Sequence, residues 1–223
     1  MKKAVFLKKL SMTSIIDESG VVYPATMLKF VEQEIVEIKN KEKHGYNSLL
    51  YAYEDIKEKK LNKPKVGFFK KRKKSVKKYL KEIRLSDSSY DEIVQLENND
   101  DIHQKYTSLS TFEEKDIVSV RGKSKGKGFQ GTIKVHNFHR GPMSHGSKNH
   151  RLPGSTGAGT TPGRIYPGKR MAGRYGGKKV TTRSLEILKI DADHNLLVVK
   201  GSVPGKPGSL LNIRPAKRFG VTT

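Results

Sequence analysis

The sequence contains no cysteine, which excludes a disulfide framework, thiol chemistry and zinc sites built from cysteine. It also lacks any apolar run of about 18 residues and any basic helical segment with a broad apolar face, so contact with a membrane is not expected. At the N-terminus, only the short apolar segment Ala4–Leu7 separates two pairs of lysines. This segment is too short for the core of a signal peptide, and we expect no secretion.

Negative charge is also missing from a long part of the chain. Residues 117–185, a stretch of 69, contain no Asp or Glu but hold 15 of the 45 Lys and Arg and 14 of the 21 glycines. Glycine loses the most backbone entropy on ordering, and apolar residues are too sparse here to form a core, so the stretch needs the surface of a partner. The net charge of +23 and the pI near 10.0 favour nucleic acid as that partner.

Strand patterns are present on both sides of this stretch. They cover Ala4–Leu7, Val21–Phe30, Glu34–Lys39 and Ser48–Tyr53 before it, and Leu185–Ile190, Leu196–Val199 and Leu210–Arg214 after it. Short strands without long helical periods predict a mainly β fold with a small closed or nearly closed barrel. Between them, the basic run Lys70–Lys78 is interpreted as a phosphate contact, and the acidic segment 87–116 as an insert or loop turned away from the polyanion.

A glycine motif at Gly126–Gly131 matches G-x-G-x-x-G but does not indicate a dinucleotide site. The motif should open a helix and be followed by an acidic residue, whereas Thr132–Val135 has a β pattern and the next acid is Glu186. We therefore expect the glycines to let the backbone approach phosphates that neighbouring lysines neutralise.

Four histidines, His136, His139, His145 and His150, lie within 15 residues, but no cysteine or carboxylate nearby completes a metal site. The imidazoles are expected to hydrogen-bond or stack on RNA, as are Phe138, Tyr166 and Tyr175. Without a carboxylate between Asp116 and Glu186, no acid/base pair can form in this region. We expect no enzyme activity, no metal, no cofactor and no small-molecule substrate.

Longer motifs are similar to a known family. The sequences KGKGF at 125–129, HGSKNHRLPGS at 145–155, TPGR at 161–164 and GKRMAG at 168–173 resemble the signature of the universal ribosomal protein L-three family of the large subunit. KKLSMT at 8–13, HGY at 44–46 and VKGSVPG at 199–205 extend the resemblance over the whole chain, with spacing closest to the bacterial form. Ser11 replaces the usual glycine, and Thr160 stands where several bacterial relatives carry a methylated glutamine, so no such methylation is expected.

The resemblance implies a mainly β fold: a translation-protein type β-barrel with a small α+β insert and a long extended basic arm. The expected divisions are 1–55, 112–128 and 177–223 for the barrel body, 56–111 for the inserted basic/acidic subdomain and 129–176 for the arm. It further implies a structural constituent of the large ribosomal subunit that binds large-subunit rRNA. The arm would reach toward the peptidyl transferase centre, and the protein would act early in subunit assembly beside the L-fourteen and L-nineteen families.

The expected location is the cytoplasmic large subunit, with an organellar ribosome as the alternative. The residues expected to bind RNA are lysines, arginines and histidines in or beside the arm. They are Lys123, Lys125, Lys127, Lys134, His136, Arg140, His145, Lys148, His150, Arg151, Arg164, Lys169, Arg170, Arg174, Lys178 and Lys179. The expected arm tip is Gly157, Ala158, Gly159 and Thr160. Two other classes stay open on charge alone: an enzyme acting on nucleic acid, and a nucleic-acid chaperone without a fixed site.

Overall fold

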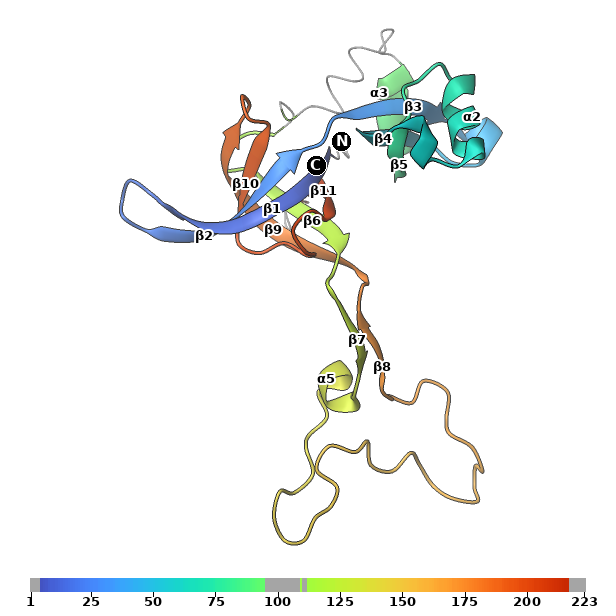
Figure 1. The fold of residues 1–223 in the computed structure, drawn as a ribbon, viewed down its shortest axis with the longest axis vertical. Helices are drawn as coiled ribbons and strands as arrows, with labels where there is room; N and C mark the ends of the chain where they lie inside the picture. Colours follow the sequence, from blue (N-terminus) through green and yellow to red (C-terminus); the bar gives the residue numbers. More distant parts are fainter. Residues whose placement is uncertain (1–4, 95–108, 110–111, 217–223) are drawn as a thin grey trace. The chain divides into compact units, whose positions relative to one another are not determined.

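The computed structural model describes residues 5–94, 109 and 112–216, and the chain divides into two compact units (Figure 1). Unit 1 combines Met1–Lys123 with Lys179–Thr223, and unit 2 is Ser124–Lys178. The fold is mainly β, as predicted. Residues 95–108 and 110–111, in the acidic segment predicted to be an insert or loop, lie outside the described residues.

Six antiparallel strands of unit 1 form a closed barrel in the order β1-β11-β6-β9-β10-β2. The strands are β1 (Val5–Ile16), β2 (Val22–Phe30), β6 (Ile117–Lys123), β9 (Lys179–Asp191), β10 (Leu196–Lys200) and β11 (Leu210–Pro215). Closure pairs the first strand with the last, with Val5 opposite Ile213. The barrel therefore unites both ends of the sequence, as the strand patterns predicted.

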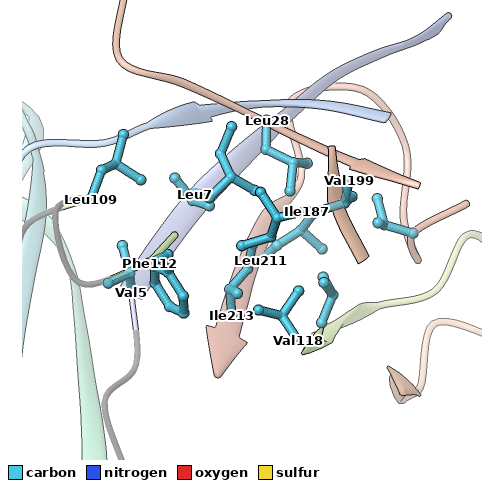
Figure 2. Packing of buried hydrophobic residues seen from close by; sticks show 13 residues of the cluster. Val5, Leu7, Leu28, Leu109, Phe112, Val118, Ile187, Val199, Leu211 and Ile213 are labelled. Atoms are coloured by element: carbon cyan, nitrogen blue, oxygen red, sulfur yellow. The ribbon is translucent and has the colours of Figure 1, made fainter. Parts of the chain in front are cut away.

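Alternating apolar side chains of these strands fill the barrel interior. Figure 2 shows residues such as Leu7, Ile187 and Leu211 pointing toward one another in one cluster, and all three are fully buried. Lys9 is also buried, and its Nζ donates to the carbonyl oxygens of Val203 and Gly205 at 3.0 and 3.4 Å. These bonds satisfy the ammonium group that burial removes from water.

The other strands of unit 1 form a separate three-stranded sheet in the order β3-β4-β5. The sheet comprises β3 (Gln33–Lys39), β4 (Ser48–Asp55) and β5 (Lys77–Arg84), and the short helix α1 (Lys41–His44) joins its first two strands. After the 3₁₀ turn η1 (Glu58–Lys60), helix α2 (Lys63–Lys71) buries Phe69 among Val36, Leu50 and Ala52. A second cluster includes Phe6, Tyr51, Tyr53 and Ile93, the last from α3 (Asp87–Val94).

The expectation that residues 1–55 belong to the barrel is therefore wrong for β3 and β4. These strands pair with each other and with β5, and β4 is buried along most of its length. Such burial requires that other elements cover both faces of the sheet. The outer face of a barrel strand is instead normally exposed.

Unit 2 contains a two-stranded ribbon, β7 (Gly126–Gln130) and β8 (Gly173–Gly176), and the helix α5 (Thr132–His136). The β pattern predicted for Thr132–Val135 is wrong, because this segment forms that helix. Lys134 and Val135 donate backbone hydrogen bonds to the Gly131 carbonyl, and Asn137 ends the helix in the left-handed region at φ 58°. The ladder of β7 with β8 ends at the pair Gln130–Gly173, so it stops before this segment.

Candidate nucleic-acid interface

Unit 2 concentrates positive charge without any compensating acid. Its 55 residues hold 11 Lys and Arg and no Asp or Glu, which is nearly half of the net charge of +23 in a quarter of the chain. Every one of these Lys and Arg residues is exposed. In the part of the chain that the structure describes, the ion pairs all join residues of unit 1, such as Lys8 with Glu54. The cations of unit 2 are therefore available to an external anion.

The β7–β8 ribbon presents three of these cations on a thin backbone. Lys125 precedes β7, Lys127 lies on it, and Arg174 lies on β8. The strands approach so closely at Gly176 that an added Cβ would stand 2.1 Å from the Lys125 carbonyl oxygen. The Nζ of Lys127 lies 5.1 Å from the centre of the Tyr175 ring, a cation–π contact that orients the ammonium group.

Helix α5 carries Lys134 and His136. The Nε2 of His136 lies 3.0 Å from the carbonyl oxygen of Met171, which ties the helix to the segment entering β8. The His136 ring also lies 5.9 Å from the Phe138 ring. One ring nitrogen of His136 therefore has a local structural role, and the expected RNA contact falls to the rest of the ring.

A compact loop is built around Gly141 and His150. The Gly141 N–H donates to the His150 carbonyl oxygen at 3.1 Å, and His150 Nδ1 lies 2.9 Å from the Pro142 carbonyl oxygen. A Cβ on Gly141 would stand 1.9 Å from the Asn149 carbonyl oxygen, so only glycine fits. This loop places Lys148 and His145, both exposed, on its surface.

Large apolar side chains of unit 2 are exposed rather than packed together. Phe129, Leu152 and Tyr166 are 74, 68 and 62% exposed, and within unit 2 only Thr132 is buried. The predicted tip, residues 157–160, is exposed throughout, and the Ser155 hydroxyl accepts from the Gly157 N–H at 3.3 Å. Apolar and aromatic faces open to solvent beside cations suit base stacking against a nucleic acid.

The structure distributes the 16 predicted residues over the ribbon, α5 and the loops rather than gathering them in one cluster. Fourteen lie in unit 2, and Lys123 and Lys179 lie in unit 1, opposite each other at the end of β6 and the start of β9. All 13 predicted lysines and arginines are exposed. A surface of this kind can follow a phosphate backbone.

Three arginines of the barrel strands are not among the residues predicted to bind RNA: Arg121, Arg183 and Arg214. Burial and then the nearby Arg121 guanidinium lower the pKa of Arg214, whose Nε donates to Asn212 at 2.9 Å. The two like charges repel each other, and a bound anion would lower that repulsion. Arg121 and Arg183 lie in the acid-free stretch and could have been found from it, whereas Arg214 has no such local signal.

The basic run at residues 70–78 is largely engaged within unit 1. Five of its cations form ion pairs with acids of the same unit: Lys70 with Glu58, Arg72 with Glu37, Lys74 with Glu34, Lys77 with Asp55, and Lys78 with Glu54. Lys71 and Lys73 are exposed and have no carboxylate partner among the described residues. The run therefore contributes fewer free charges to a phosphate interface than its sequence indicates.

Among residues 5–94, 109 and 112–216, no group of three or more His, Cys, Asp or Glu side chains could hold a metal ion. Over the same ranges, no helix has the length and apolar character needed to cross a membrane.

Comparison with known proteins gives a consistent result. Residues 38–195 match the family model described as Ribosomal protein L3. The chain is 52% identical over 222 residues to "Large ribosomal subunit protein uL3" of Prochlorococcus marinus (strain NATL1A), covering 100% of this chain and 97% of the relative. It is 50% identical to the protein of that name from Synechococcus sp. (strain CC9605), covering 99% and 96%, and 49% identical to that from Gloeothece citriformis (strain PCC 7424), covering 99% and 100%. The chain belongs to the ribosomal protein L3 family, as its motifs predicted.

Proposed function

We propose that this protein is a structural constituent of the large ribosomal subunit, without enzyme activity, and that it binds large-subunit rRNA mainly through unit 2. The observation that carries this proposal is the set of 11 exposed Lys and Arg residues in a unit without a single acid. Family membership supports the ribosomal setting, since the relatives are named large ribosomal subunit proteins.

Binding would combine neutralisation of RNA phosphates by cations with stacking of aromatic rings on bases. Exposed cations along the ribbon and loops would contact phosphates, and exposed rings such as Phe129 and Tyr166 would stack on unpaired bases. Glycine lets the backbone approach RNA closely where a Cβ would not fit, as at Gly141. Because unit 2 has little core of its own, RNA contacts would supply much of its stability.

We further assign residues 129–176 as an arm that reaches toward the peptidyl transferase centre, and give the protein a role in early subunit assembly. The neighbours would be the ribosomal proteins L-fourteen and L-nineteen, and the location would be the cytoplasmic large subunit or its organellar counterpart. The support for these finer points is the resemblance of the arm motifs at 145–155 and 168–173 to the family signature.

Removing unit 2 tests the proposal directly. Lys123 and Lys179 are opposite each other in the β6–β9 ladder, so an Asn-Gly turn can replace residues 124–178 and close a hairpin. We expect the deletion variant to keep the barrel, measured by circular dichroism and a cooperative unfolding transition. We also expect it to lose most of its affinity for large-subunit rRNA in a filter-binding assay.

Transfer RNA in excess serves as the competitor for the intact chain. A complex that survives the competitor requires shape-specific recognition in addition to charge attraction. Full affinity in the deletion variant would refute the role of unit 2. Complete displacement by transfer RNA would instead favour a nucleic-acid chaperone without a fixed site.

A further inference from the structure

One part of unit 1 differs in charge from the rest of this basic protein. From Leu10 to Leu28 the chain contains no Lys or Arg, although 45 such residues occur in the whole sequence. The segment forms the end of the β1–β2 hairpin, drawn in blue in Figure 1, where it extends past the other barrel strands. Its turn carries two exposed acids, Asp17 and Glu18. We refer to residues 10–24 as the distal hairpin.

The turn of the distal hairpin is well formed. The Gly20 N–H donates to the Asp17 carbonyl oxygen at 2.8 Å, and Gly20 has a φ of +78°, which glycine adopts without strain. The Glu18 N–H donates to the Asp17 side chain at 2.8 Å. Both acids therefore lie on a defined, solvent-exposed turn, where the Asp17 carboxylate accepts from the Glu18 N–H.

The strand register gathers apolar side chains on one face. Ile16 pairs with Val22 and Met12 with Thr26, and directly opposite residues of an antiparallel pair share a face. Met12, Ile16 and Val22 are 50, 69 and 58% exposed on this face. On the opposite face, Tyr23 is only partly exposed, and Lys200 Nζ lies 4.2 Å from its ring centre. One face is thus partly covered within the unit, while the other exposes Met12, Ile16 and Val22 and is covered only at its inner end, where Thr26 is buried.

The outer edges of the distal hairpin are also free of strand partners among the described residues. β1 pairs with β11 only at residues 5–8, and β2 pairs with β10 only at residues 25–29. Open edges beside an exposed apolar face make a surface that proteins normally cover. RNA is a poor cover here, because its phosphates would meet Asp17 and Glu18 with no cation of the hairpin between them.

We propose that the distal hairpin docks a second protein, and that this partner is a basic chain with apolar contact residues, present in the same ribosomal particle. The partner's apolar side chains would cover Met12, Ile16 and Val22, and its cations would face Asp17 and Glu18. The proposal rests on the proposed function for its setting, but it assigns to this surface a protein, in contrast to the RNA assigned to unit 2.

Site-specific photocrosslinking in assembled large subunits tests this assignment. A photoreactive phenylalanine analogue replaces Ile16 in the full chain, and in a matched control it replaces Tyr166, an exposed apolar residue of unit 2. After irradiation, we expect the adduct at position 16 to resist ribonuclease and to contain peptides of a Lys- and Arg-rich protein. The adduct at position 166 should be RNA. Adding D17K and E18K should reduce the yield of the protein adduct severalfold, and more so at low salt.

An RNA adduct at position 16, an adduct with a second copy of this chain, or no adduct there while position 166 crosslinks to RNA would each overturn the docking proposal. Failure of position 166 to crosslink to RNA, with a protein adduct at position 16, would count against the rRNA role of unit 2 and leave the docking surface supported. The two proposals can therefore fail separately.

Discussion

Neutralising three cations of unit 2 should change how RNA affinity depends on salt. The triple variant R164Q/K169Q/R170Q removes three exposed charges from the irregular segment between α5 and β8. Each phosphate contact contributes about −0.7 to −0.9 to the slope of log affinity against log salt concentration, for single strands and duplexes respectively. If all 11 Lys and Arg of unit 2 bind phosphate, the slope of the intact chain is about −8 to −10. In the variant the slope should become shallower by about 2 to 3.

The measurement is a series of binding isotherms to large-subunit rRNA between about 50 and 200 mM salt. The variant K41Q/K70Q/K74Q serves as a matched control, because it removes the same net charge from unit 1. In the intact chain these three lysines form ion pairs with Asp87, Glu58 and Glu34. Its slope should stay close to that of the intact chain, because these cations are already engaged. Equal changes of slope in the two variants would mean that net charge alone governs binding, and would refute the assignment of the contacts to unit 2.

Three further predictions concern stability and loop geometry. I187A removes a fully buried barrel side chain and should lower the free energy of unfolding by about 2–5 kcal/mol in urea titrations, whereas a loss below about 0.5 kcal/mol would contradict the packing. The hydrogen bond from Lys39 lowers the pKa of Glu82 below 4.5, so this carboxylate stabilises the fold above its ordinary pKa, and the effect is lost as the pH falls through the folded value. E82Q should therefore cost up to about 1 kcal/mol near pH 7 and little in acid; a pH-independent difference would refute the ion pair as its source. G141A should lower rRNA affinity about tenfold by breaking one or two loop hydrogen bonds. The control G159A, where an added Cβ meets nothing within 4 Å, should leave the affinity unchanged. Equal effects of the two variants would exclude the clash of the added Cβ with the Asn149 carbonyl as the cause.

The strand patterns predicted most of the barrel strands because these segments are rich in apolar and β-branched residues, although β1 extends to Ile16, well past the predicted Leu7. The predicted strands Leu185–Ile190 and Leu196–Val199 fall within β9 and β10, and Val21–Phe30 matches β2 closely. The sequence did not predict which strands pair, because the pattern of apolar residues within a strand does not specify its neighbour in the sheet. β3 and β4 were therefore placed in the barrel although they pair with β5 and support α2.

The candidate interface was predictable to the extent that it depends on composition. The absence of acids over residues 117–185 directly indicates which cations lack local partners. Local geometry was not predictable: Thr132–Val135 has β-branched residues typical of strands, yet it lies past the end of the β7–β8 ladder and forms helix α5. The engagement of Lys70–Lys78 with acids from β3, β4 and η1 was also hidden, because those acids are distant in sequence.

Barrel closure through β1 and β11 has a consequence for the order in which the nascent chain folds. β1 begins at Val5, and its partner β11 ends at Pro215, so the residues from one strand through the other must be synthesised before the ring can close. The β3-β4-β5 sheet needs only sequence up to Arg84 and can form much earlier. Since synthesis proceeds at about 5–20 residues per second, the first strands remain without their final neighbour for about ten seconds or longer. A protein of this fold therefore completes its barrel core only after the residues of β11 have been synthesised.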